Sequence, residues 1–465
     1  MQDKYEATTT PTPSQETLPQ GVPENSFLEI QKIKEKRKRL IIISIAVFAG
    51  VLILGGALVY LITATFNKKP KEIVLTMWGI RQPQSVYSSV INQYEKSHPG
   101  VKINYIQVPS KNYESTLFQT LQKGGNTPDI VTIGNTYLPI FQKYLYPAPS
   151  NIININTFKS IFYPTAFQDL TSNGNIYALP SNYDGLSLIY NKTEFAKAGL
   201  SAPSSNINTF VSQIPKLVVK DSNGNVTQAA IDIGKSTGNI NNAYNILTYL
   251  MFINNTQMIG GNQVTFANGP QAQEALNLYY QIAQTDGWSA TFPNSVSAFA
   301  GGSVAMILEP SWEIQNIFIL NPNINIGVMA PPQIPGQNVN LSLYFAKAVV
   351  KYSQYPQVAW NFLNYLDSQS TLTTLYNNEI KNKEVLGEVF PRTDMANLAT
   401  NYKYMEPFVQ MAPTSKSWEM GDYKFVDNVF NSVIEGNISL SQAQNQIFKT
   451  LASIINGVYI VPPNE

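Results

Sequence analysis

Residues 177–200 read YALPSNYDGLSLIYNKTEFAKAGL, and this stretch decides how the rest of the chain is interpreted. The Asn-Gly pair at 173–174 precedes it and is typical of a tight hairpin turn, because both residue types tolerate positive φ. The pattern therefore predicts that residues 176–179 form the returning strand of a hairpin. Pro180 is expected to end that pairing, because proline has no backbone N–H to donate.

The second half of the stretch predicts a buried strand followed by a helix. Residues 186–190, LSLIY, are apolar enough for a strand that is covered on most of its surface. Residues 192–198 resume with helical spacing, and Gly199 is placed to end the helix as a C-terminal cap. The turn at 183–185, Tyr-Asp-Gly, separates the hairpin from the buried strand.

The pattern LP-x-x-x-D-G-L-x-L-x-Y-N-K, followed by K-A-G-L, resembles the signature of the family 1 extracellular solute-binding proteins, the sugar-binding receptors of ABC importers. The resemblance implies that the chain passes here from the first lobe of a two-lobed protein to the second, and that Asp184 faces the ligand. The alternative is that Tyr183, Asp184 and Gly185 form only a turn between strands. That alternative is compatible with ligand contact, because turns at a domain crossing often line the cleft.

Other segments resemble the same family in the same order. They are a strand at 73–78 ending in Trp-Gly, helices at 84–96 and 112–123 around a strand at 101–108, a Gly-x-x-Pro-Asp motif at 125–129, an F-x-x-G-x-x-A-M motif at 299–306 and Phe-Pro-Arg at 390–392. The resemblance covers residues 73–455. Residues 341–346 depart from the family pattern, so the resemblance gives this loop no ligand role.

The fold class is therefore predicted to be α/β, a two-lobed periplasmic-binding-protein-like (type II) fold with a hinge between the lobes, preceded by one transmembrane helix. The expected parts are a disordered basic cytoplasmic tail at 1–39, a signal-anchor helix at 40–62, a linker at 63–72, lobe 1 at 73–181 plus 330–368, and lobe 2 at 182–329 plus 369–465. Two lobes also suit a chain of 465 residues, which is too long for a single core.

The membrane segment is predicted from charge and length. Residues 32–39 are strongly basic, and residues 40–62 carry no charge over a length that crosses a hydrocarbon layer of about 30 Å. The basic cluster is expected to stay in the cytoplasm, which places the folded part in an extracellular or periplasmic position at the cell membrane. Lys68, Lys69 and Lys71 weaken this asymmetry. A cleaved signal peptide is the alternative interpretation.

Composition excludes several classes of site. The chain has no cysteine and one histidine, His98, so disulfide frameworks, thiolate metal sites and multi-histidine metal sites are excluded. His98 is expected to be structural or solvated.

The net charge of +1 gives no sign of the basic surface that nucleic-acid binding requires. The Asp-x-Asn-x-Asn spacing at 221–225 faintly resembles a calcium-binding loop. An EF-hand loop has a bidentate glutamate at its twelfth position and lies between two helices, whereas here that position is Asp232 and the flanking segments are predicted to be strands. No metal, cofactor or catalytic residue is predicted.

The resemblance places a set of aromatic and polar side chains at the cleft, where flat apolar faces suit sugar rings and polar groups suit hydroxyls. The candidate ligand-binding residues are Trp78, Arg81, Asn135, Tyr183, Asp184, Glu309, Trp312, Trp418 and Tyr423. A core position is the alternative for each aromatic residue, and a solvated surface position is the alternative for Arg81 and Asn135. Ile133 and Thr136 replace the tryptophan and acidic residue of some sugar-binding relatives, which argues against a maltodextrin-type specificity.

The predicted function is capture of a carbohydrate by a membrane-tethered monomer that delivers it to an ABC transporter permease. A polyol or a peptide is an alternative ligand. A surface sensor or adhesin with the same fold is an alternative function, because fold alone does not decide between them. A glycoside hydrolase that uses Asp184 and Glu309 as its carboxylate pair is a further alternative.

Overall fold

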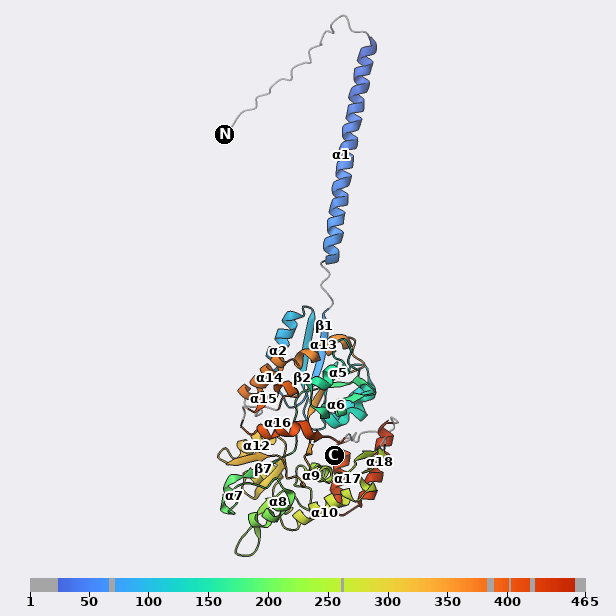
Figure 1. Ribbon diagram of the computed structural model, residues 1–465. Coiled ribbons are helices and arrows are strands. Elements are labelled where there is room, and N and C mark those ends of the chain that lie inside the picture. The colour runs from blue at the N-terminus through green and yellow to red at the C-terminus, as the bar shows by residue number, and fades with distance from the viewer. Residues whose placement is uncertain are drawn as a thin grey trace, which may run out of the picture. The chain divides into compact units, whose positions relative to one another are not determined.

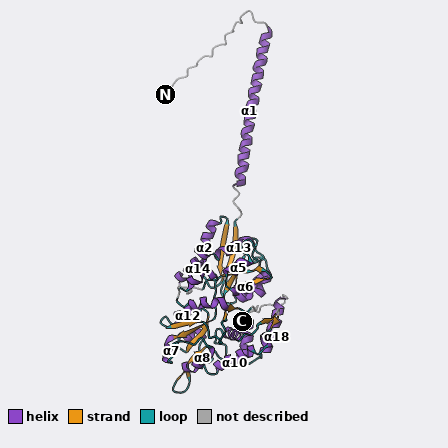
Figure 2. Ribbon diagram, in the orientation of Figure 1, coloured by secondary structure: helices purple, strands orange, loops and turns teal. Residues whose placement is uncertain are grey.

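The computed structural model describes residues 24–66, 72–260, 263–382, 389–400, 403–418 and 423–455. It divides into two units, residues 1–71 and residues 72–465, which are described separately below. Figure 1 traces the elements along the chain, and Figure 2 distinguishes the helices from the strands.

The first unit contains one long helix, α1 (Glu24–Phe66). Its apolar part, Leu28–Leu61, is long and apolar enough to cross a membrane, by length and composition. The sequence interpretation of residues 24–39 as disordered is wrong, because these residues continue the apolar helix without a break. Their Lys, Arg, Glu and Gln side chains are good helix formers, and an adjoining stable helix removes the cost of nucleation. Residues 1–23 and 67–71 lie outside the described part.

The second unit is built around two five-stranded sheets. The first sheet has the order β2-β1-β3-β15-β6. Its strands are β1 (Ile73–Gly79), β2 (Val101–Gln107), β3 (Ile130–Gly134), β15 (Phe345–Val349) and β6 (Ala178–Pro180). The second sheet has the order β13-β7-β12-β9-β8. Its strands are β13 (Ile326–Met329), β7 (Ser187–Asn191), β12 (Val304–Glu309), β9 (Val226–Ile231) and β8 (Val219–Lys220). Each sheet with its helices forms one lobe, as the predicted fold class requires.

Helices cover the faces of both sheets (Figure 1). Those that contribute to the first core are α2 (Gln84–Ser97), α3 (Tyr113–Lys123), α4 (Leu138–Phe141), α5 (Ile155–Ile161), α6 (Pro164–Leu170) and α13 (Pro356–Leu366). Those that contribute to the cores around the second sheet are α7 (Lys192–Lys197), α8 (Ile207–Gln213), α9 (Ala243–Ile253), α10 (Gln271–Ala283), α11 (Ser295–Ala300), α12 (Glu313–Leu320), α15 (Ala396–Ala399), α16 (Glu406–Met411), α17 (Tyr423–Ile434) and α18 (Leu440–Ile455). Trp360 is fully buried in the first core.

Short paired strands complete the architecture. These are β4 (Thr171–Ser172) with β5 (Asn175–Ile176), β10 (Ile259–Gly260) with β11 (Gln263–Val264), and β14 (Asn340–Leu341) with β16 (Ser415–Lys416). The predicted hairpin at 173–174 is confirmed, because both turn residues have positive φ. A capping box precedes α18: Gln442 N–H donates to the Ser439 hydroxyl, and Ser439 N–H donates to the Gln442 side chain.

Pro180 has a different place from the one expected. The hairpin ends before it, at the pair Thr171–Ile176, and Pro180 pairs with Ala346 as part of β6 in the first sheet. This is possible because β6 is an edge strand, where a missing N–H leaves no neighbouring carbonyl unpaired.

Helix α14 (Gln369–Asn382) also differs from the sequence expectation, which assigned these residues to lobe 2. The Asn378 side-chain amide donates to the Val86 carbonyl and to the Ser89 hydroxyl, at 2.8 and 2.9 Å, and both acceptors lie on α2 of the first lobe. Leu372 and Tyr376 on the same helix join the core beside the second sheet. Helix α14 therefore bridges the two lobes, which explains why chain order alone misplaced it.

The segment around Gly185, which joins the two sheets, lies very close to residues 341–342. Gly185 forms an isolated antiparallel bridge with Ser342, and a Cβ at Gly185 would lie 2.8 Å from the Leu341 carbonyl oxygen. Only glycine at position 185 therefore allows this segment to approach residues 341–342 so closely.

We expect Gly185→Ala to lower the free energy of unfolding by about 1–3 kcal/mol, because the added methyl group must push backbone away. Gly238→Ala is the matched control, because a Cβ there meets no atom within 4 Å. Chemical denaturation of both variants measures the difference. Equal unfolding midpoints for the two variants would contradict the close approach.

Candidate ligand-binding site

The loop after β1 presents Arg81 in an unusual backbone conformation. Arg81 has a φ of 66°, which is uncommon for a residue with a side chain. The loop is held there by Val108 N–H, which donates to the Gly79 carbonyl at 2.8 Å, and by the Tyr105 hydroxyl, which donates to the Gln82 carbonyl. Strained backbone that its surroundings hold in place is a feature of functional sites.

The Arg81 side chain lies against two aromatic rings, and we call Arg81, Trp312 and Phe345 the Arg81 cluster. The guanidinium carbon lies 4.3 Å from the centroid of the Trp312 ring and 5.9 Å from that of Phe345. The two ring centroids are 6.4 Å apart. All three side chains are partly exposed. Since Trp312 follows β12 of the second lobe whereas Arg81 and Phe345 belong to the first, the Arg81 cluster spans the boundary between the lobes.

Phe345 was missed by sequence reasoning. It lies in the 341–346 loop, where the departure from the family pattern removed the expectation of a ligand role. Phe345 is the first residue of β15, an interior strand, so it lies where a loop enters the sheet, a place where ligand contacts are common. Its proximity to Trp312 comes from the packing of the two lobes.

Asp184 lies at the lobe crossing, as predicted, but its carboxylate is fully buried. It accepts hydrogen bonds from Gly185 N–H at 2.7 Å, from Ser311 N–H at 3.1 Å and from the Ser311 hydroxyl at 2.5 Å. The carboxylate therefore ties the crossing to the loop after β12, and direct contact of Asp184 with ligand stays a prediction.

Glu309 ends β12 and is also buried, with 1% of its surface exposed. Its carboxyl group accepts a hydrogen bond from the Asn242 side chain at 2.5 Å. Burial, and then the nearby Asp232 and Glu313, raise the pKa of Glu309 well above its usual range. Together with the fully buried Asp232 and Asp286, it forms a group of buried acids in the second lobe. Burial raises the pKa of Asp232 to about 7 and that of Asp286 to about 8.

Asn135 belongs to a buried hydrogen-bond network centred on Asp169. The Asp169 carboxylate accepts from the Asn135 amide at 3.1 Å, from the Tyr344 hydroxyl at 2.8 Å and from the Ser417 hydroxyl at 2.6 Å. Ser417 follows β16, so the network fixes the late segment of the chain to the first lobe. The position of Asn135 is structural in this arrangement, rather than the solvated one considered as its alternative.

The remaining candidates do not join the Arg81 cluster in the contacts described. Trp418 is 1% exposed and packs against Phe430 and Phe266, and Tyr183 is 2% exposed, which favours the core alternative for both. Trp78 is partly buried against the first core. Tyr423 begins α17, but its side chain lies outside the described part.

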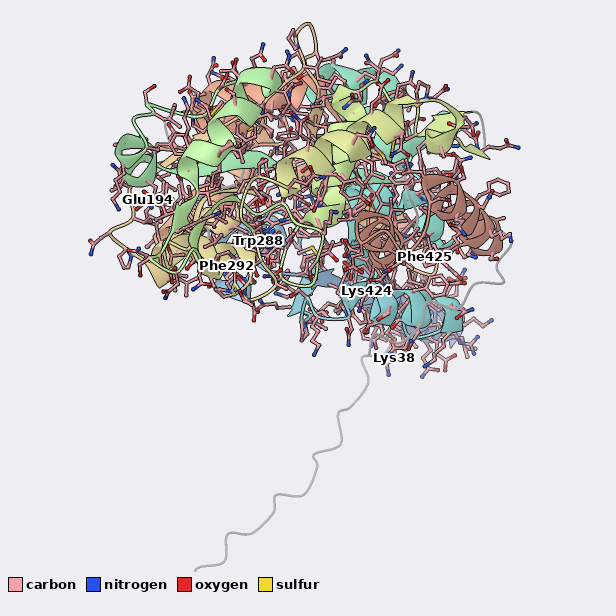
Figure 3. All side chains as sticks on the ribbon, turned by 90° about the horizontal axis from the view of Figure 1, so that it is seen from below. Lys38, Glu194, Trp288, Phe292, Lys424 and Phe425 are labelled. Atoms are coloured by element: carbon pink, nitrogen blue, oxygen red, sulfur yellow. The ribbon has the colours of Figure 1, made fainter. Side chains whose placement is uncertain are left out.

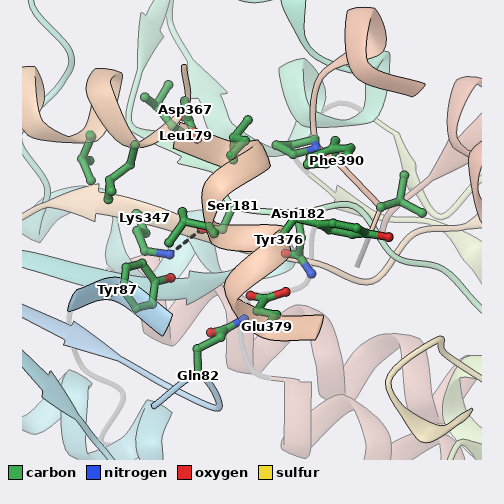
Figure 4. A pocket seen from close by; sticks show the side chains of 16 residues that line it. Gln82, Tyr87, Leu179, Ser181, Asn182, Lys347, Asp367, Tyr376, Glu379 and Phe390 are labelled. Carbon is green, nitrogen blue, oxygen red and sulfur yellow. Dashed lines mark hydrogen bonds between the residues drawn. The ribbon is translucent and has the colours of Figure 1, made fainter. Parts of the chain in front are cut away.

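A cavity of about 50 Å³ is lined by Gln82, the residue after Arg81, and by Lys347, two residues beyond Phe345 (Figure 4). Gln82 and Lys347 line one side of it, and the Lys347 ammonium group donates to the Ser181 hydroxyl at 2.9 Å. Asp367 and Glu379 also line it. Ser181, Lys347 of β15 and residues 389–391 also contribute to its wall. The cavity therefore has a mixed lining, with leucines and Phe390 beside its polar groups.

Aromatic residues also gather in the second lobe, away from the Arg81 cluster in sequence. The Trp288 and Phe292 rings have centroids 5.5 Å apart, and both are labelled in Figure 3. The Trp288 indole N–H donates to the Asn239 side chain at 3.2 Å. Its ring packs on Gly234, where a Cβ would lie 2.6 Å from a ring carbon, so this pair serves the packing of the second lobe.

The described residues contain no group of three or more His, Asp or Glu side chains that could hold a metal ion. His98 stacks on Tyr94 with ring centroids 4.0 Å apart, and its Nδ1 lies 3.0 Å from the Tyr94 carbonyl oxygen. For a glycosidase, Asp184 and Glu309 would need access to substrate, and in this arrangement both carboxyl groups are buried and hydrogen-bonded.

We expect Asp184→Ala to lower the free energy of unfolding by about 1–3 kcal/mol, because it leaves buried Ser311 and Gly185 N–H groups without an acceptor. Asp184→Asn keeps an oxygen acceptor and should cost less. Chemical denaturation measures both. A structural role would be contradicted if Asp184→Ala unfolded like the wild type and lost only ligand binding.

The buried acids predict a pH dependence of stability. Their pKa values in the folded protein lie above the ordinary value of 3.8, so the folded state binds more protons and the stabilising contribution is complete only below about pH 4. The free energy of unfolding should therefore fall as pH rises from about 4 to about 8. Asp232→Asn should flatten this fall in a thermal-denaturation series.

Asp221→Asn is the control for that series, because hydrogen bonds from Asn225 lower the pKa of this exposed carboxyl group. Its substitution should leave the fall in place. A wild-type midpoint that rises steadily from pH 4 to pH 8, with Asp232→Asn unchanged from it, would contradict the interpretation.

Solved structures with the same fold support the two-lobed architecture. A solute-binding protein of an ABC transporter from Thermotoga lettingae, bound with alpha-D-tagatose, has a TM-score of 0.65 and 18% identity, and the match covers 83% of this chain and 100% of that one. The sugar-binding protein MalE of Xanthomonas citri has a TM-score of 0.67 and 17% identity, with 83% and 98% covered. The GacH receptor of Streptomyces glaucescens has a TM-score of 0.64 and 15% identity, with 84% and 100% covered.

Sequence comparison agrees with the structural one. A Brucella abortus (strain 2308) protein that is provisionally named a binding protein is 23% identical over 353 residues, which cover 72% of this chain and 81% of the relative. The family model described as "Bacterial extracellular solute-binding protein" matches residues 79–371, which include the lobe crossing, the loop after β12 and Phe345. The chain therefore belongs to the bacterial extracellular solute-binding protein family.

Proposed function

We propose that this protein captures a carbohydrate between its two lobes and delivers it to an ABC importer. The observation that carries the proposal is the Arg81 cluster, which places two partly exposed aromatic rings and a cation at the lobe boundary. Sugar rings stack on such faces through their apolar C–H surfaces, while nearby polar groups take the hydroxyls. Solved relatives of the same fold were obtained with tagatose, maltotetraose and mannotriose, which supports a saccharide as ligand class.

The mechanism follows from the position of the Arg81 cluster on both sides of the boundary. A ligand that contacts Trp312 and Phe345 together gains both contacts only when the lobes are close. Its binding energy therefore favours the closed arrangement over the open one. The chain segments that join the lobes, such as residues 181–186, change their backbone angles as one lobe rotates relative to the other, as hinge segments do in two-lobed binding proteins.

Helix α1 is proposed to tether the folded unit to the cell membrane. Its apolar part is long enough to span, and the basic residues at 32–39 favour a cytoplasmic amino terminus. A tethered receptor stays near a permease in the same bilayer, which raises its effective concentration there. The closed, loaded form is the one that we expect to dock on the permease.

The test is a thermal-shift titration of the full chain in detergent micelles against mono- and oligosaccharides, amino acids and polyols. A ligand that binds only the folded state raises the unfolding midpoint as its concentration increases. We expect a saturable shift with a saccharide, and we expect Trp312→Ala to weaken it about 10-fold or more, because a stacking face is lost.

Tyr352→Ala is the matched control, because this exposed aromatic residue follows β15 and does not belong to the Arg81 cluster. Its shift should equal that of the wild type. If no saccharide raised the midpoint while a polyol, amino acid or peptide did, the carbohydrate assignment would be wrong. Release of reducing ends from an oligosaccharide would instead favour the glycosidase alternative.

A further inference from the structure

The two acidic residues predicted for the cleft are not accessible, whereas Arg81 is. Asp184 and Glu309 are 0% and 1% exposed and are hydrogen-bonded within the protein. Arg81 is partly exposed, as is Glu313 next to Trp312. A carboxylate accepts hydrogen bonds from sugar hydroxyls, whereas a guanidinium group only donates. The polar group that contacts the two aromatic rings is therefore a cationic donor.

The geometry of Arg81 fits recognition of an anion. Its guanidinium carbon lies 4.3 Å from the Trp312 ring centroid, the distance of a cation–π contact. A guanidinium group that meets a ring through its face keeps its N–H groups in its own plane. Those groups form the fork that pairs with the two oxygens of a carboxylate, or of a sulfate or phosphate.

The backbone around Arg81 holds that side chain ready. Its φ of 66° sets the direction of the loop, and Gln107 donates to the Arg81 carbonyl at 3.3 Å. A loop that is fixed before binding loses little entropy when ligand arrives. Pairing with an anion does not require the guanidinium group to be unpaired within the protein, because it carries five N–H donors.

The other charged groups near the Arg81 cluster are of both signs. Lys347 lies two residues beyond Phe345 in β15, so both side chains are on the same face of the sheet. Asp367 and Glu379 line the cavity with Lys347, and the Glu313 carboxylate, next to Trp312, accepts from Asn316 at 2.8 Å. Only Arg81 contacts the rings of the cluster as a cation in the described part of the chain, so it is the group placed to choose between ligands that stack there.

We propose that the ligand is an acidic saccharide, with a carboxylate or sulfate group that pairs with Arg81 while its ring contacts the parts of Trp312 and Phe345 that Arg81 leaves exposed. The proposal rests on the proposed function and specifies its ligand class. Arg81 is then the residue that determines specificity between acidic and neutral sugars.

The test uses the full chain in detergent micelles and trisaccharides in three matched forms. Uronate trisaccharides, their carboxyl-reduced neutral forms, and sulfated derivatives of the neutral forms are each titrated by calorimetry. We expect one acidic form to bind about 10-fold or more tightly than its neutral partner, with an affinity that falls as salt rises. Tight binding of the uronate identifies a carboxylate as the anion, and tight binding of the sulfated form identifies a sulfate.

Two variants separate the side chain from the backbone. Arg81→Asn removes the charge but keeps positive φ accessible, because asparagine tolerates that conformation. It should remove the discrimination between acidic and neutral forms without lowering the unfolding midpoint of the ligand-free protein. Arg81→Lys should retain part of the discrimination, because it keeps the charge and loses the fork.

Each other result overturns the proposal. If neutral and acidic forms bound equally, or if Arg81→Asn still preferred the acidic form, Arg81 would not select an anion although saccharide capture would stand. If no form bound to the wild type, the proposed function itself would fail together with this inference.

Discussion

The structure depends on the hydrogen bonds that satisfy the Asp184 carboxylate at the crossing between the two sheets. A buried carboxylate without partners costs several kcal/mol, so the donors around it are a strong constraint on the fold. Two of those donors belong to Ser311, next to Trp312. The bonds that make the crossing possible therefore also fix the position of the aromatic residue that the second lobe contributes to the candidate site.

A second buried carboxylate, that of Asp169 in the first lobe, joins chain segments in the same way. Asp169 collects donors from Asn135, Tyr344 and Ser417, which come from distant parts of the sequence. Because a carboxylate with several donors is both satisfied and rigid, it holds segments together where there is little apolar surface to pack. Tyr344 precedes Phe345, so this network also supports the first-lobe side of the Arg81 cluster.

The candidate site consequently depends on both lobes and on the boundary between them. Arg81 is oriented by its own strained loop, and Trp312 and Phe345 are each oriented by a buried carboxylate nearby. Under the proposed function, a ligand that contacts all three side chains favours the closed arrangement of the lobes. The second lobe adds its buried acids, whose raised pKa values predict a pH-dependent stability and which contribute no accessible charge to the site.

The sequence by itself determined the element order, the buried crossing strand, the hairpin at 173–174 and the apolar helix, because these follow from local periodicity and turn chemistry. It also identified Arg81, Trp312 and Asp184 as residues of interest. Only the tertiary structure decided which of them meet. Whether a polar side chain is buried depends on donors far away in the chain, as for Asp184 and Ser311. Helix α14 was assigned to lobe 2, and Phe345 was not selected as a site residue, for the same reason: their partners lie on the other lobe or on a helix almost 300 residues earlier in the chain, and local patterns carry no record of such contacts.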